Sequence, residues 1–244
     1  MSLPAYEPVQ SSFTDDPDDN YKNEVMVASC ELKVRQMFIR KVYSLLLVQI
    51  VGSVLVGAVI NFNPSVQAWC VNNLWFSILC MISTFVFLFA AYFKSRSYPI
   101  NLIFLAAFTF CEAFTVGLSC AFIESNAVIQ ALVLTLVIFV GLTAFAFQTK
   151  YDFTSYQGVL GIGLWVLISM GFVFMFFPTQ TSGLHMVYSG LGALIFCCYI
   201  VVDTQLIMQK FSVEDEIMAT ITLYLDILNL FWFILSLLEN RNDN

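Results

Sequence analysis

Seven stretches of this chain are apolar and long enough to cross a bilayer as helices, which limits the possible folds more than any other feature. They cover roughly residues 42–60, 74–93, 100–123, 127–147, 158–177, 184–208 and 218–238. A helix needs about 20 apolar residues to cross the hydrocarbon core of a membrane. Because 59% of the residues are hydrophobic and 11% are charged, a water-soluble domain is excluded. The sequence therefore predicts an all-α integral membrane protein, a bundle of seven transmembrane helices.

The predicted membrane domain covers residues 31–239 and is flanked by two polar segments. Residues 1–30 are rich in acidic residues and contain three prolines but few large aliphatic side chains. This composition predicts a disordered acidic tail. Nucleic acid is not an expected partner, because an acidic segment repels phosphates. Residues 240–244 form a short C-terminal tail.

The basic residues predict how the helices are oriented. All ten Lys and Arg residues except Arg241 lie before the first span or in the second, fourth and sixth loops. Basic residues concentrate on the cytosolic side of membrane proteins, so the N-terminus is expected in the cytosol. Seven crossings then place the C-terminus on the other side. A re-entrant last segment would instead return Arg241 to the cytosol, and the sequence leaves both alternatives open.

Three acidic residues lie inside the spans, whereas no Lys or Arg does. They are Glu112 in the third span, Asp203 in the sixth and Asp226 in the seventh. A charged Asp near the centre of a membrane helix costs about 2.5–3.5 kcal/mol on the insertion scale. Without a basic partner, such a group must be protonated, share a proton, or face water and a cation. Intramembrane acids are therefore candidates for a functional site.

Asp203 and Asp226 lie at similar depths in consecutive helices. Asp203 is about 8 Å before the end of the sixth span, and Asp226 is about 12 Å after the start of the seventh. The two spans form a hairpin around residues 209–217, so the carboxylates can face each other. Two close carboxylates cannot both ionise cheaply, so we expect them to titrate as one coupled unit. Such a pair suits a proton-sensitive gate or a site for a hard cation such as Ca²⁺.

Other polar residues lie near this pair. Thr222, Asp226 and Asn229 share one face of the last helix, because they are four and three residues apart. Glu214, with two further acids in the same loop, is predicted to form an acidic mouth beside the hairpin. Simpler interpretations stay open: Asp203 can bind a neighbouring backbone group, the loop acids can be surface charge, and Glu112 can be a protonated packing residue.

Catalytic and cofactor sites are not expected. The only histidine, His185, lies at the start of a span, and the chain has no HExxH, GxSxG or phosphate-binding glycine motif. The seven cysteines lack the paired spacing of a zinc or redox site. The sequence therefore predicts neither an enzyme nor a bound cofactor.

Several motifs together are similar to a known family. They are Phe38-Ile-Arg40-Lys41-Val-Tyr43, Glu112-Ala-Phe-Thr-Val-Gly117, Gly141-Leu-Thr143, Tyr199-Ile-Val-Val-Asp203-Thr-Gln205 and Leu223-Tyr-Leu-Asp226-Ile-Leu-Asn229-Leu-Phe231. In this order and spacing they resemble the transmembrane Bax-inhibitor-motif, or lifeguard, family. The resemblance covers about residues 30–239 and is strongest to the subgroup of lifeguard four, or Golgi anti-apoptotic proteins.

The resemblance implies a seven-helix channel that leaks Ca²⁺ from intracellular stores and protects against apoptosis and ER stress. It implies residence in the ER, Golgi or a related membrane such as that of the vacuole or lysosome. It assigns Asp203 and Asp226 as a pH-sensitive pair that can bind Ca²⁺, and it assigns Glu214 an effect on ion passage. The alternative function is a non-conducting scaffold that regulates cell-death or unfolded-protein signalling through protein partners. The expected partners are the bilayer, Ca²⁺ and cell-death regulators, and the oligomeric state is left open.

Overall fold

The computed structural model of the chain describes residues 26–27, 32–177 and 182–242. The helices are α1 (Leu32–Phe62), α2 (Pro64–Asn72), α3 (Leu74–Phe93), α4 (Ile100–Cys120), α5 (Ser125–Gln148), the short 3-10 helix η3 (Thr154–Tyr156), α6 (Gln157–Phe176), α7 (Ser182–Gln209) and α8 (Glu216–Asn242). Within the described residues, 7 helices are long and apolar enough to cross a membrane: α1 and α3 to α8. The predicted seven-helix membrane fold is therefore confirmed. Most of the predicted acidic tail lies outside the described residues.

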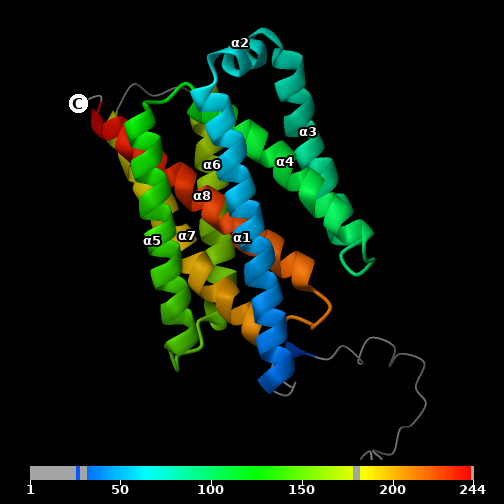
Figure 1. Cartoon of the computed structure of the whole chain (residues 1–244). Coiled ribbons are helices and arrows are strands. Elements are labelled where there is room, and N and C mark those ends of the chain that lie inside the picture. The colour runs from blue at the N-terminus through cyan, green and yellow to red at the C-terminus, as the bar shows by residue number, and fades with distance from the viewer. Residues whose placement is uncertain (1–25, 28–31, 178–181, 243–244) are drawn as a thin grey trace, which may run out of the picture.

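The helices alternate in direction, so the loops gather at two ends of the bundle (Figure 1). Lys94, Arg96, Lys150 and Lys210 lie in the loops at the end where α1 begins, which we call the basic end. The other end, where α1 meets α2, we call the far end. The last segment, α8, is one continuous helix that runs from the basic end to the far end (Figure 1). Its continuity favours a seventh crossing over a re-entrant segment.

Helix α8 forms the centre of the bundle. It packs against α7 most closely and also against α1, α3, α4 and α5. Leu223, Leu230 and Leu235 of α8 are fully buried. Helix α6 lies at the periphery, where it packs against α7 and exposes most of its side chains. The two helices that carry the predicted aspartate pair are thus among the best buried of the fold.

Glycine allows α1 and α4 to approach closely near the far end. A Cβ atom on Gly117 would lie 2.9 Å from the Cα of Gly57, closer than such atoms approach in proteins. The Asn61 amide nitrogen donates to the carbonyl of Gly57 at 2.8 Å and to that of Gly117 at 3.1 Å. Two adjacent helices therefore share one side-chain hydrogen-bond donor.

Two helical segments differ from the sequence prediction. Helix α1 begins at Leu32 rather than at residue 42, because its basic first part forms helix readily outside the apolar run. Helix α2 occupies the predicted first loop. The Asn63 side chain caps it by accepting from the backbone N–H groups of Ser65 and Val66, and Pro64 occupies its first position. The apolar runs thus marked the spans but not the full length of the helices.

Candidate functional site

The structure brings the carboxyl groups of Asp203 on α7 and Asp226 on α8 together inside the bundle. They lie close enough to interact directly, and the two residues are only 8% and 5% exposed. The second carboxyl oxygen of Asp226, Oδ2, is buried and has no hydrogen-bond partner among the described residues. The ring of Tyr199, one turn before Asp203, lies near both groups. The pairing expected from their depths is therefore present.

No Lys or Arg in the described part of the chain forms an ion pair with either aspartate. Two buried carboxylates at this range repel each other strongly when both are charged. A proton held between them removes one charge and supplies the donor for a hydrogen bond. The arrangement is therefore compatible with one proton shared by the two carboxyl groups.

Three buried hydroxyl groups gather in the same half of the bundle as the pair. The hydroxyls of Thr143 on α5 and Thr204 on α7 lie near the Tyr43 hydroxyl on α1. None of the three oxygens has a hydrogen-bond partner within the described residues. Buried polar groups normally find a partner, so this cluster suits a polar guest such as water. Sequence reasoning did not single out Tyr43 or Thr143, although family-like motifs contain both.

Gln205, two residues after Asp203, fixes the loop between α5 and α6. Its Oε1 accepts from the Phe153 backbone N–H at 2.7 Å, and its Nε2 donates to the Tyr151 carbonyl at 2.9 Å. The residue is 2% exposed. One side chain thus satisfies two backbone groups and holds the basic end of α7 against this loop.

The other predicted residues of the last helix and of α4 do not join the pair. Thr222 and Asn229 donate to carbonyls of their own helix, those of Met218 and Leu225. Glu112 of α4 lies near the Thr84 hydroxyl on α3, which donates to the Cys80 carbonyl of its own helix at 3.1 Å. Thr222, Asp226 and Asn229 therefore keep the expected spacing along the last helix, but each makes its own local contact and they do not bind one another.

The acidic loop between α7 and α8 is more neutral than its sequence indicates. Asp215 accepts from the Arg96 guanidinium, with 3.1 Å between Nε and Oδ1, and Glu216 forms an ion pair with Lys41. These pairs connect the start of α8 to α1 and to the loop between α3 and α4. Glu214 is exposed and has no ion-pair partner in the described residues. Glu214 is thus the one acid of the predicted mouth whose charge has no basic partner in the described residues.

Comparison with known proteins places these residues in context. A family model described as "Inhibitor of apoptosis-promoting Bax1" matches residues 35–243. Bax inhibitor 1 of Schizosaccharomyces pombe is 40% identical over 99% of this chain and 91% of its own length. Protein lifeguard 4 of Mus musculus is 34% identical, and the Golgi anti-apoptotic protein of vaccinia virus is 33% identical. Each of these two alignments covers 92% of this chain and 94% of the relative.

Proposed function

The chain belongs to the Bax inhibitor, or lifeguard, family of anti-apoptotic membrane proteins, and from this premise we propose that it is a pH-sensitive, Ca²⁺-permeable leak channel. By lowering the Ca²⁺ content of an intracellular store, it would protect the cell against apoptosis and ER stress. We place it in the ER, the Golgi or a related membrane, with the basic end in the cytosol. The observation that carries the proposal is the buried Asp203–Asp226 pair, which has no basic partner in the described residues.

In this proposal the shared proton holds α7 against α8. While one proton lies between the two carboxyl groups, their hydrogen bond joins the helices and the site carries one negative charge. Loss of that proton leaves two charges that repel each other and attract a divalent cation. We therefore expect the leak to increase as the pH rises.

The pair has too few oxygen ligands to hold Ca²⁺ permanently, which favours passage of the ion over tight binding. Ca²⁺ takes six to eight oxygen ligands in proteins, and two carboxyl groups provide at most four. The hydroxyls of Tyr43, Thr143 and Thr204 offer further oxygens in the same half of the bundle, and water would complete the shell. Glu214, exposed in the loop before α8, would raise the local cation concentration at the basic end.

Ca²⁺ release from liposomes that contain the purified full-length chain tests the proposal. We expect release by the wild-type protein to be faster at mildly alkaline than at mildly acidic pH. Asp203→Asn and Asp226→Asn should each abolish this difference, because the one remaining carboxylate has no charged partner that repels it. Asp152→Asn makes the same chemical change in an exposed loop and should retain the wild-type profile.

One outcome would reject the gating role of the pair, and another would reject the leak itself. The pair has no gating role if both Asn variants keep the pH profile of the wild type. If the wild-type protein releases no more Ca²⁺ than empty liposomes, the family's protective role would have to be exerted by a non-conducting scaffold. Protection of stressed cells by a non-releasing variant would then support the scaffold directly.

A further inference from the structure

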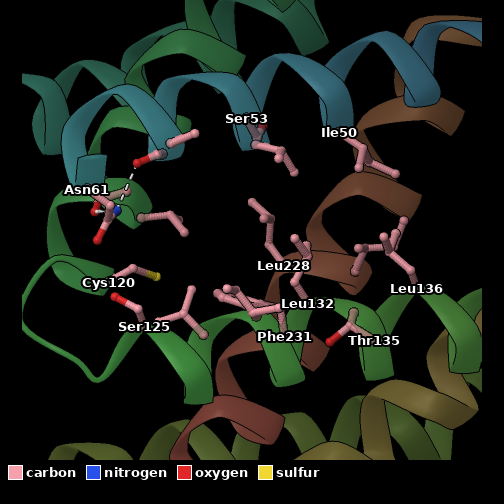
Figure 2. A pocket seen from close by; sticks show the side chains of 18 of the residues that line it. Ile50, Ser53, Asn61, Cys120, Ser125, Leu132, Thr135, Leu136, Leu228 and Phe231 are labelled. Carbon is pink, nitrogen blue, oxygen red and sulfur yellow. Dashed lines mark hydrogen bonds between the residues drawn. The ribbon is translucent and has the colours of Figure 1, made fainter. Parts of the chain in front are cut away.

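An apolar groove lies between α1 and α5 in the half of the bundle toward the far end. Its volume is about 320 Å³, within the range of small-molecule sites. Helices α1 and α5 form its two walls, and α8 and α4 form its floor. Figure 2 shows an open space between these helices, with Asn61, Cys120 and Ser125 at one end and Ile50 and Leu136 at the other. The Asp203–Asp226 pair lies outside this groove.

The groove opens sideways because its two walls are separated along this stretch. Both α1 and α5 pack against α8, and their contact with each other, the rings of Tyr43 and Phe147, lies toward the basic end, outside the groove. The residues that face the space are chiefly Ile, Val, Leu and Phe side chains. At this depth of a membrane protein, the medium outside the opening is lipid hydrocarbon. The groove is therefore accessible to bilayer lipids rather than to water.

The polar groups inside the groove already have protein partners. The Tyr224 hydroxyl lies 2.7 Å from that of Ser53, and Thr135 donates to the Ala131 carbonyl at 2.7 Å. Water enters a cavity only when several polar groups can bind it. An apolar occupant, in contrast, replaces no hydrogen bond here.

The length of the groove matches one leaflet of a bilayer. Ile50 and Asn61 on α1 are eleven residues apart, as are Ser125 and Leu136 on α5. Both wall segments are thus about 16 Å long, close to half of the roughly 30 Å hydrocarbon core. The groove begins at the far end and stops near mid-membrane, as an acyl chain of that leaflet does.

The mouth of the groove has polar groups that suit a lipid headgroup region. The Asn61 amide nitrogen donates to two backbone carbonyls, which leaves Oδ1 as an acceptor without a donor among the described residues. Ser125 begins α5 at the same end and is exposed. Polar groups are thus found at the mouth, while those deeper in the groove are satisfied.

We propose that this groove binds one acyl chain of a phospholipid from the far-end leaflet, with the chain carbonyl near Ser125, whose hydroxyl can donate to it, and the chain end near Ile50 and Leu136. The bound chain would fill the space between α1 and α5 and connect the two helices. The inference does not rest on the proposed Ca²⁺ leak, and its test uses no ion flux.

Photo-crosslinking in nanodiscs tests the site and its direction. Phosphatidylcholine with a diazirine at the chain end should label peptides that contain Ile50 or Leu136. The same lipid with a diazirine beside the carbonyl should label peptides that contain Phe62 or Ser125. Uniform labelling of these peptides and of the outward face of α6 would overturn the proposal, and stronger labelling by a photoreactive sterol would overturn the choice of occupant.

Matched tryptophan variants separate the groove from the ordinary lipid-facing surface. Leu132→Trp fills the groove and should lower labelling several-fold, whereas Val133→Trp, on the lipid-facing side of the same helix, should leave it unchanged. If Leu132→Trp does not fold, Ala58→Phe and its outward neighbour Val59→Phe test the opposite wall in the same way. Equal labelling within each matched pair would overturn the proposal.

Discussion

The α7–α8 hairpin and the groove between α1 and α5 share helix α8 but differ in how they use buried space. Toward α7, α8 presents Asp226, whose carboxyl group lies beside that of Asp203 and has one oxygen without a hydrogen-bond partner among the described residues. Toward the groove it presents Ile227, Leu228 and Phe231, which leave a space that no described side chain fills. The half of the bundle toward the basic end thus buries polar groups that lack partners among the described residues, and the half toward the far end contains a space that their side chains do not fill.

This difference shows that burial alone does not describe the interior of a membrane protein. An acyl chain can take the place of an apolar side chain in the groove at little cost in free energy, because lipid tails are about as apolar as such side chains. It cannot replace the partner of a buried carboxyl or amide group. We therefore expect substitutions of polar groups near the basic end to destabilise the fold more than changes of similar size along the groove.

Gln205→Leu should have the largest effect. It strands the N–H of Phe153 and the carbonyl of Tyr151, and each stranded backbone group costs about 1–3 kcal/mol. Thermal unfolding in detergent micelles measures the loss. Gln209→Leu, one turn later and only half buried, is the matched control and should change little. Equal losses in the two variants would show that the loop contacts do not stabilise the basic end.

Gly117→Ala should have the next largest effect, at the far end. Its Cβ would meet the Cα of Gly57 at 2.9 Å, so α1 and α4 must separate, and overpacking of this kind costs about 1–3 kcal/mol. Gly52→Ala on α1 meets nothing within 4 Å and should stabilise the helix slightly. The same thermal assay applies. A neutral Gly117→Ala would mean that the far end is looser than the structure shows.

Tyr224→Phe should have a smaller effect, because it removes one hydrogen bond at the floor of the groove. The Tyr224 hydroxyl lies 2.7 Å from that of Ser53, and such a bond contributes about 0.5–1.5 kcal/mol. Ser53→Ala and the double variant complete a thermodynamic cycle. A loss in the double variant smaller than the sum of the single losses supports the bond, whereas strictly additive losses would contradict it.

The Arg96–Asp215 ion pair should contribute least. The Arg96 side chain is 45% exposed, and exposed pairs contribute about 0–1 kcal/mol. Asp215→Asn should therefore shift the unfolding temperature slightly, and high salt should remove the shift by screening the wild-type pair. A large shift that persists in high salt would show that the loop before α8 has a structural role beyond charge.

The sequence was sufficient to predict the helices and the aspartate pair, because both depend on patterns along the chain. Apolar length marks a span, and depth along two consecutive helices places Asp203 opposite Asp226. The family resemblance was also confirmed, since the motifs lie in the matched region. The roles of Glu112, Glu214 and the pair in ion passage stay predictions.

The remaining features depend on how distant helices meet, which one sequence does not reveal. The hydroxyl cluster forms only because Tyr43 and Thr143 converge on α7 in three dimensions. The groove depends on α1 and α5 both packing on α8 while staying apart from each other toward the far end. Helix α2, in contrast, had a readable signal, because Asn63 followed by Pro64 is a typical helix start.

The central claim is that Asp203 and Asp226 act as one protonation unit. A double-mutant cycle, in which Ca²⁺ release is measured as a function of pH, tests this claim most directly. Release would be measured over the same pH range for the wild type, Asp203→Asn, Asp226→Asn and the double variant. If the two groups share one proton, either single variant abolishes the pH dependence and the double variant changes it no further. A pH response that is halved in each single variant and lost only in the double variant would show two independent groups and contradict the account.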